Sequence, residues 1–355
     1  MRLRSVVLIL ILAAGLVLAL GLPPARIDPV AWTPPPAPAA VDDATLDRVQ
    51  TRVPELGAGG EGLALDAQGR VLAGLADGRL RRYDPRSGAI EDLGSSGGRP
   101  LGLVLDAEQR LVIADPLRGL LRREADGRLT VLSTGTAERP ARFIDDVDTH
   151  AEDPRLYFTD ASDRFGYGEH QLEALEHRPN GRLLRFDPAS GRTETLASHL
   201  YFANGVALGP AAAYALVTET SAYRISRVWL TGERRGEREV FAENLPGFPD
   251  NLSYDPLRRC FWVALYAPRS ALLDALLPHP QLRRWLSRLP AALQPHPAHH
   301  PQLLAFEEDG RRRHHWQSRL PASYGPITSV EADAGGLWLG SLSASGIGRL
   351  ELPVP

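Results

Sequence analysis

Cysteine is almost absent from this sequence, because Cys260 is the single one among 355 residues. An internal disulfide and a cysteine-rich metal site are therefore both excluded. Neither sign of charge is in excess, since the formal net charge is -3. This balance argues against a nucleic-acid partner, which would require a basic face. Hydrophobic residues make up 43% of the chain. That share is enough for a globular protein with a sizeable core.

The N-terminus carries an uncharged, mostly apolar run from Ser5 to Leu22, which follows Arg2 and Arg4. A helix that spans a bilayer typically needs about 20 apolar residues, and the core of a signal peptide is usually shorter. The run also lacks a good cleavage site, so the sequence favours a membrane anchor over residues 1–24. A cleaved signal peptide and a secreted protein are the alternative. The two arginines predict that the rest of the chain lies on the non-cytoplasmic side, periplasmic or extracellular. Residues 25–40 are rich in proline and are interpreted as an extended spacer.

The folded domain is expected over residues 41–355, and one pattern recurs in it. Each unit has an apolar alternating run, a polar turn, a second run, another turn and a third run. The six units begin at Gly62, Gly102, Val147, Gly205, Asn251 and Val330. Short strands separated by Asp-Gly, Ser-Gly and Asp-Pro turns indicate an all-β protein, and about 40–45 residues is the size of a four-stranded propeller blade. The repeats predict a six-bladed β-propeller, with a pair of β-sandwiches as the alternative.

Two insertions interrupt the repeats. The first, GYGEHQLEALEHRPN, lies in the third unit, and the second covers about residues 268–300 in the fifth. The second places leucines and Trp285 at helical spacing between prolines, which predicts two short amphipathic helices. These helices are expected to form a lid over one face of the propeller or to pack on its rim. Their basic face, from Arg283 to Arg288, could also contact a membrane surface.

Polar side chains come just before the first strand of four of the six units. They are Glu61, the pair Asp145 and Asp146, Asn204, and Asp250 beside Asn251. Since the first strand of each blade lines the central channel, these side chains are expected to converge near the propeller axis. Carboxylate and amide oxygens are the ligands that calcium prefers, and magnesium or manganese could use the same set. The pattern predicts a divalent-cation site, although each Asp or Asn taken alone could simply cap a turn.

Five motifs, in order along the chain, resemble the strictosidine synthase-like family, of the adipocyte plasma membrane-associated protein type. They are RPLGLVLD, FIDDVDTHAEDPRLYFTDAS, HRPNGRLLRFDPASGRTETLA, FANGVALGP and FPDNLSYDP. This family is related to the paraoxonases and to the gluconolactonase/senescence-marker group. The resemblance runs from about Glu61 to the end of the chain and implies a six-bladed propeller. An N-terminal anchor followed by a short spacer is also similar to the membrane-associated members.

The resemblance also implies a site. In the calcium-dependent relatives, the metal ligands lie at positions that match Glu61, Asn204 and Asp250, with Asn251 beside them. A further ligand falls at Asp145. Those relatives hydrolyse lactones, aryl esters or phosphotriesters, and the residue that matches Asp250 acts there as base or nucleophile as well as ligand. The resemblance therefore implies a bound Ca²⁺, or another divalent cation, and a catalytic role for Asp250.

Two departures from the relatives keep other functions open. Leu101 stands where the paraoxonases have one histidine of a catalytic dyad, so that proton shuttle is absent. Strictosidine synthase itself condenses an amine with an aldehyde without a metal, through a glutamate near the position of Glu331. The expected function is a membrane-tethered, calcium-dependent esterase or lactonase, of arylesterase type, acting on a small hydrophobic ester or lactone. A condensing enzyme with Glu331 as acid and base, and a non-enzymatic propeller scaffold, are the alternatives.

Overall fold

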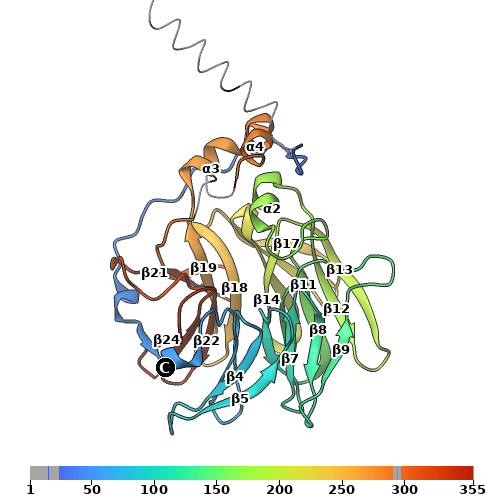
Figure 1. Cartoon of the computed structure of the whole chain (residues 1–355), viewed down its shortest axis with the longest axis vertical. Helices are drawn as coiled ribbons and strands as arrows, with labels where there is room; N and C mark the ends of the chain where they lie inside the picture. Colours follow the sequence, from blue (N-terminus) through green and yellow to red (C-terminus); the bar gives the residue numbers. More distant parts are fainter. Residues whose placement is uncertain (1–14, 16–23, 291–293, 295–296, 355) are drawn as a thin grey trace, which may run out of the picture.

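A computed structural model describes residues 15, 24–290, 294 and 297–354 of the chain. Within these residues, 24 strands form six four-stranded antiparallel sheets. In five of the sheets the strands are paired in chain order, as in β2-β3-β4-β5. Figure 1 shows the sheets below a small group of helices at one end of the molecule. The predicted six-bladed β-propeller is confirmed.

The first blade contains β2 (Leu63–Leu65), β3 (Val71–Gly74), β4 (Arg79–Tyr83) and β5 (Ile90–Ser95). The second contains β6 (Leu103–Leu105), β7 (Leu111–Asp115), β8 (Gly119–Arg123) and β9 (Leu129–Ser133). The third contains β10 (Ile144–His150), β11 (Asp153–Asp160), β12 (Gly181–Asp187) and β13 (Arg192–Leu200). The fourth contains β14 (Ala203–Leu208), β15 (Tyr214–Glu219), β16 (Arg224–Trp229) and β17 (Arg238–Ala242). The fifth contains β18 (Gly247–Asp255), β19 (Cys260–Pro268), β20 (Gln302–Glu307) and β21 (Arg312–Gln317).

The sixth blade joins the two ends of the propeller domain. It contains β22 (Ser329–Asp333), β23 (Gly336–Gly340), β24 (Ile347–Glu351) and, from the N-terminal side, β1 (Gln50–Arg52). The outer strand β1 pairs antiparallel with β24, with Thr51 opposite Gly348. Backbone hydrogen bonds therefore close the ring without a covalent link, which fits a chain with one cysteine.

The core lies between neighbouring blades. One apolar cluster joins the fourth blade to the fifth, because Leu216 and Ile225 pack with Phe261 and Val263. The second strand of the fifth blade, β19, reads CFWVALYAP and is almost wholly buried, since it packs against blades on both sides. Outer strands such as β5 are mostly exposed. Burial thus decreases from the inner strands to the rim, as expected for blades packed face to face around an axis.

Among the described residues, three α-helices are complete. They cover one end of the propeller, as Figure 1 shows. They are α2 (His170–Glu176) from the third blade, and α3 (Ala271–Leu276) and α4 (Pro280–Leu286) from the insertion in the fifth. The Ser270 side chain caps α3 by accepting a hydrogen bond from the Leu273 amide at 3.2 Å. Four 3₁₀ turns complete the regular structure of the described residues: η1 (Thr45–Arg48), η2 (Pro54–Leu56), η3 (Pro210–Ala212) and η4 (Thr220–Ala222). We call α2, α3 and α4 together the lid.

The proline-rich segment before the propeller lies against the lid. The Val30 amide donates to the Glu176 carbonyl at 3.2 Å, and the Trp32 amide donates to the Leu277 carbonyl at 3.1 Å. Arg283 in α4 is fully buried and donates to the carbonyls of Val30, Leu175 and Leu277. A buried guanidinium whose two terminal nitrogens donate to carbonyls of different segments holds those segments together. The structure thus adds to the predicted spacer a packing role on the lid.

The predicted membrane anchor over residues 1–24 falls almost entirely outside the residues that the structure describes. Across the remainder, which is described apart from short gaps, no helix has both the length and the apolar character needed to cross a membrane.

Candidate active site

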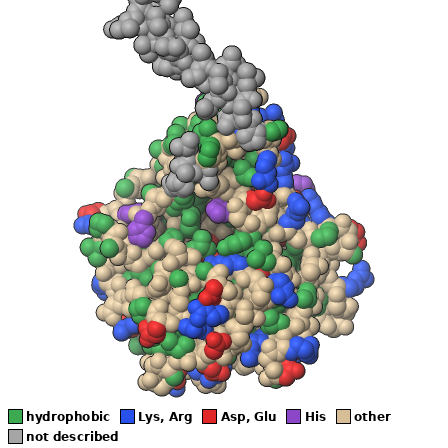
Figure 2. All heavy atoms as spheres, viewed as in Figure 1, with side chains coloured by type: hydrophobic (Ala, Val, Ile, Leu, Met, Phe, Trp, Pro, Cys, Tyr) green, Lys and Arg blue, Asp and Glu red, His purple; other side chains and the backbone are tan. Residues whose placement is uncertain are grey.

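A cavity of about 390 Å³ lies between the lid and the propeller. Figure 2 shows hydrophobic side chains gathered around a hollow beneath the lid. Most of the cavity wall is apolar and includes Leu101, Phe143, Phe202 and Phe248 from the propeller and Leu175, Leu273, Leu276 and Leu286 from the lid. Its polar floor is formed by Glu61, Asp145, Asn204 and Asp250. An apolar pocket with a few convergent polar groups is the usual form of a small-molecule site.

The same irregularity in strand pairing places three of the four floor residues. In the third, fourth and fifth blades, the innermost strand changes register with its neighbour between Ile144 and Val147, between Ala203 and Val206, and between Pro249 and Leu252. Asp145, Asn204 and Asp250 lie within these three shifts. Bulges of this kind break the alternation of a strand and re-aim side chains, and they are common beside active sites. The floor is therefore built by a repeated feature of adjacent blades.

A second cavity, of about 530 Å³, continues along the innermost strands away from the lid. It is lined by Asp146, Asp148, Asn251 and Glu331. The two members of each adjacent pair thus face different cavities, with Asp250 toward the lid and Asn251 away from it. The structure brings the four floor residues together, but it does not bring the other two predicted site residues, Asn251 and Glu331, to them.

Burial and mutual repulsion oppose ionisation of the floor carboxyls. Burial raises the pKa of Glu61 to about 7, although the nearby Arg99 guanidinium opposes this rise. Burial, together with the negative charge of Glu61, raises the pKa of Asp145 and of Asp250 well above the ordinary value. A hydrogen bond from the Asn204 side chain partly offsets the rise at Asp250. Clustered carboxyls of this kind are typical of functional sites.

Arg99 is the floor's positive neighbour. Its side chain is 3% exposed, donates to the Gly59 carbonyl at 2.8 Å and lies 3.4 Å from the Glu61 carboxylate. Sequence reasoning missed this residue, although it directly precedes the Pro100-Leu101 pair at the start of the second repeat. When all three floor carboxyls are ionised, the Arg99 guanidinium neutralises one of their negative charges. The two negative charges that remain would be neutralised by one divalent cation.

The donor atoms at the floor fit such a cation. Asn204 Oδ1 and Asp250 Oδ1 are both buried and have no hydrogen-bond partner. Unpartnered buried oxygens are costly, and hard cations such as calcium take carboxylate and amide oxygens as ligands. However, no three His, Cys, Asp or Glu side chains in the described part of the chain are arranged to hold a metal ion. The charge and the donor types of the floor therefore fit a divalent cation. To bind one, the carboxylates would have to move closer together than they lie in this structure.

Two further side chains in the cavity can exchange or donate protons. His170 of α2 and Tyr266 of β19 both line it. Burial lowers the pKa of His170 and so favours the neutral imidazole. Burial, with the negative charges of Asp250 and Glu61, raises the pKa of Tyr266, so the phenol stays protonated and can donate. The sequence carried no signal for Tyr266, which reads as one more residue of a buried strand.

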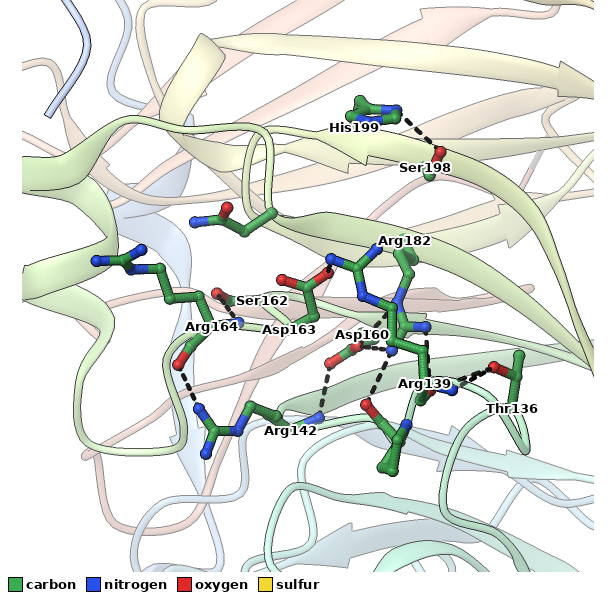
Figure 3. A network of polar contacts seen from close by, with 12 residues as sticks. Thr136, Arg139, Arg142, Asp160, Ser162, Asp163, Arg164, Arg182, Ser198 and His199 are labelled. Carbon is green, nitrogen blue, oxygen red and sulfur yellow. Dashed lines mark hydrogen bonds and ion pairs between the residues drawn. The ribbon is translucent and has the colours of Figure 1, made fainter. Parts of the chain in front are cut away.

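Asp160, the last residue of β11, holds in place the backbone segment that leads to the floor. Its buried carboxylate accepts hydrogen bonds from the backbone amides of Arg142 at 3.1 Å and Phe143 at 2.9 Å, and from Arg182 Nε at 3.1 Å. Figure 3 shows Asp160 at the centre of this network, between Arg142 and Arg182. The network fixes the backbone that leads to Phe143 in the cavity wall and Asp145 in the floor.

Comparisons with known proteins agree with this fold. The family model for strictosidine synthase matches residues 145–233. A gluconolactonase structure from Xanthomonas campestris covers 93% of this chain and 96% of its own, with a TM-score of 0.62 and 18% identity. A calcium-binding protein, regucalcin, from Agrobacterium tumefaciens covers 88% of this chain and 96% of its own, with a TM-score of 0.55 and 16% identity. At these identities the two structures show a shared fold.

Similarity in sequence is closer to the strictosidine synthase-like proteins. Strictosidine synthase-like protein 7 of Arabidopsis thaliana is 36% identical over 218 residues, which span 60% of this chain and 58% of that protein. Strictosidine synthase-like protein 3 of the same plant is 30% identical over 325 residues, 83% of each chain. The human adipocyte plasma membrane-associated protein is 30% identical over 309 residues, 79% of this chain and 73% of that one. This chain is therefore a member of the strictosidine synthase-like family.

Proposed function

We propose that this protein is a hydrolase that cleaves a lactone or an ester with an apolar body, with Ca²⁺ or another divalent cation held by Glu61, Asp145, Asn204 and Asp250. The observation that carries the proposal is a polar floor at the base of an apolar cavity, in which two buried oxygens, Asn204 Oδ1 and Asp250 Oδ1, have no hydrogen-bond partner. The names of two proteins of the same fold, a gluconolactonase and a calcium-binding regucalcin, guide the choice of reaction and ion.

The residues of the floor and wall have separate tasks in this proposal. A bound cation would supply a Lewis acid for the carbonyl oxygen of the substrate. Asp250 offers an unpartnered carboxylate oxygen, which can take a proton from the attacking water or attack the carbonyl carbon itself. The Tyr266 phenol can donate a hydrogen bond to the leaving oxygen. The aromatic and leucine side chains hold the apolar body of the substrate and exclude bulk water.

The placement of Glu331 favours hydrolysis over the alternative reaction. An amine–aldehyde condensation of the strictosidine synthase type would use Glu331 as its acid and base. Glu331 lines the second cavity with Asp146 and Asp148, whereas the apolar cavity under the lid contains Asp250 and Asn204. A large apolar substrate in the lid cavity would thus contact the floor carboxylates and not Glu331.

The remaining alternative is a non-enzymatic scaffold, in which an ion at the floor would only hold the blades together.

Aryl acetates and aliphatic lactones, incubated with the purified full chain, test the reaction and the ion together. We expect turnover of at least one class, loss of turnover after treatment with a chelator, and recovery when calcium is added back, because the ion would polarise the carbonyl. Heat-denatured protein is the control for spontaneous hydrolysis. Turnover that survives complete removal of metal contradicts the role of the ion. A protein that binds the ion but turns over neither class is instead the scaffold.

We further propose that the N-terminal run tethers the propeller to a membrane on its non-cytoplasmic side. The described chain begins at the lid end, where residues 26–36 pack, and Leu272, Leu282 and Trp285 of the lid are exposed there. A lipophilic substrate could then enter the cavity from the membrane side. We expect the full chain to remain in the membrane fraction after washes with high salt and alkaline carbonate, and a variant without residues 1–24 to be released. Recovery of the full chain in the soluble fraction contradicts the tether.

A further inference from the structure

The backbone carbonyl of every floor residue accepts a hydrogen bond from the neighbouring blade. The Gly102 amide donates to the Asp145 carbonyl at 2.9 Å, and the Thr218 hydroxyl donates to the Asp250 carbonyl at 2.7 Å. The Thr159 hydroxyl donates to the Asn204 carbonyl, and the hydroxyls of Thr328 and Ser329 donate to the Glu61 carbonyl. These contacts run around the channel from blade to blade at the level of the floor. The positions of the four floor residues are therefore coupled through the blade interfaces.

Two of these donors, Thr159 and Thr218, are used in the same way. Each is fully buried and is the last residue but one of the second strand of its blade, β11 or β15. Thr159 accepts from the Asp146 amide at 3.0 Å and donates to the Asn204 carbonyl of the fourth blade. Thr218 accepts from the Gly205 amide at 2.8 Å and donates to the Asp250 carbonyl of the fifth blade.

A hydroxyl is the group that this position requires. The register shift withdraws the Asp146 and Gly205 amides from the regular ladder, and a buried amide needs a partner. The same oxygen must also donate toward the next blade, and only a group that both accepts and donates can do this. Blades four and five meet closely at this point, since a Cβ on Gly205 would lie 2.6 Å from Asn251 Cα. The single hydroxyl of Thr218 thus spans the interface between Asn204 and Asp250.

We propose that Thr159 and Thr218 are positioning residues that set the spacing of Asp145, Asn204 and Asp250 on the floor. Thr159 links the bulge that carries Asp145 to Asn204, and Thr218 links the bulge that carries Asn204 to Asp250. The functional importance of this spacing rests on the proposed function, because the distances between these oxygens determine whether they can hold an ion. Its geometric content does not depend on the reaction.

The test compares Thr218→Val, which keeps the shape and removes the hydroxyl, with Thr218→Ser, which keeps the hydroxyl. Thr149→Val is the matched control, since the Thr149 hydroxyl in β10 donates to the carbonyls of Asp153 and Arg155 within its own blade. Ion affinity is measured on the full chain by titrating calcium and following the rise in Tm. We expect Thr218→Val to bind calcium about 10–100-fold more weakly, as is typical when a residue that orients a metal ligand is lost. Thr218→Ser and Thr149→Val should bind as the wild type does.

The outcomes separate this inference from the proposed function. Equal calcium affinity in the wild type and Thr218→Val overturns the positioning role. If calcium does not affect the wild type, the ion in the proposed function is wrong, and crystal structures of the two Thr218 variants decide the inference instead. A functional site tolerates displacements of about 0.5 Å. The inference is supported if Asn204 moves by more than this relative to Asp250 in Thr218→Val but not in Thr218→Ser. An unmoved floor in Thr218→Val overturns it.

Discussion

Replacing Asp250 by asparagine is expected to lower kcat for ester or lactone hydrolysis by about 10²–10⁴-fold, the usual contribution of a general base. The Asp250 side chain is buried, lines the lid cavity and has one carboxylate oxygen with no hydrogen-bond partner. Asparagine has nearly the same shape and can still provide an amide oxygen. It cannot take a proton from water or attack a carbonyl. Steady-state kinetics with an aryl acetate, at saturating calcium, give the result.

The control for this substitution is Asp148→Asn. Asp148 is also a carboxyl near the channel, and it accepts a hydrogen bond from the Leu208 amide at 2.7 Å, which an asparagine oxygen can still accept. Because it lines the second cavity, its replacement should leave kcat within about twofold, since it touches neither the substrate nor the floor. If Asp250→Asn hydrolyses the substrate with the wild-type kcat, Asp250 is not the base. His170, which lines the same cavity, would then be the next residue to replace.

The stability of the ion-free protein is expected to fall as the pH rises from 7 to 8.5, and calcium is expected to cancel much of that fall. Burial raises the pKa of Glu61 to about 7 and that of Asp145 and Asp250 well above the ordinary value. The folded state therefore binds more protons than the unfolded state in this window, so the free energy of unfolding decreases with pH. Calcium at 100 times its Kd would add about 2.7 kcal/mol. Thermal unfolding with and without calcium at each pH measures both effects.

Other buried groups also change the stability with pH, and they determine that the test belongs above pH 7. Burial lowers the pKa of His177 to about 3 and that of His315 to about 4, so these residues favour the folded state more as the pH rises, but only up to their ordinary value of 6.5. Above pH 7 the buried carboxyls dominate, including Asp146, whose pKa burial raises to about 8. Asp145→Asn removes one floor charge and should flatten the pH dependence of the ion-free protein. A Tm that rises from pH 7 to 8.5 without calcium would contradict the expected repulsion.

The repeats illustrate how much of the fold could be predicted. The strand-forming runs, such as GRLLRFD, and the Asp-Gly and Asp-Pro turns between them are local features, so they are visible in a single sequence. The outer strands β5 and β9 lie in the less regular stretches AIEDLG and LTVLST, which follow the three runs of the first two repeats. The lid helices α3 and α4 were predicted from leucine spacing and proline boundaries for the same reason, whereas α2 in the first insertion was not predicted. The packing of residues 26–36 against those helices was not visible, since it joins segments about 150 to 250 positions apart.

The residue types at the floor were also evident early, but their directions were not. Asp145 and Asp146 are neighbours in sequence, as are Asp250 and Asn251, yet one of each pair faces the lid cavity and the other the second cavity. In contrast, Glu331 is the middle residue of β22, which pairs with β23 without a register shift, and it also faces the second cavity. The directions within the two pairs have a different cause. A register shift decides these directions, and no local signal in FIDDVD or FPDNLS reports where a bulge will form.

By itself, the sequence determined the number of blades, the insertion that carries α3 and α4 of the lid, and the oxygen-rich chemistry near the axis, because strand periodicity, turn residues and side-chain types are properties of short segments. Only the tertiary structure decided which oxygens share a cavity and which distant residues join them. Arg99, Tyr266 and Thr218 acquire their places when the blades close into a ring, since the contacts they make depend on neighbouring blades and on bulges set by packing.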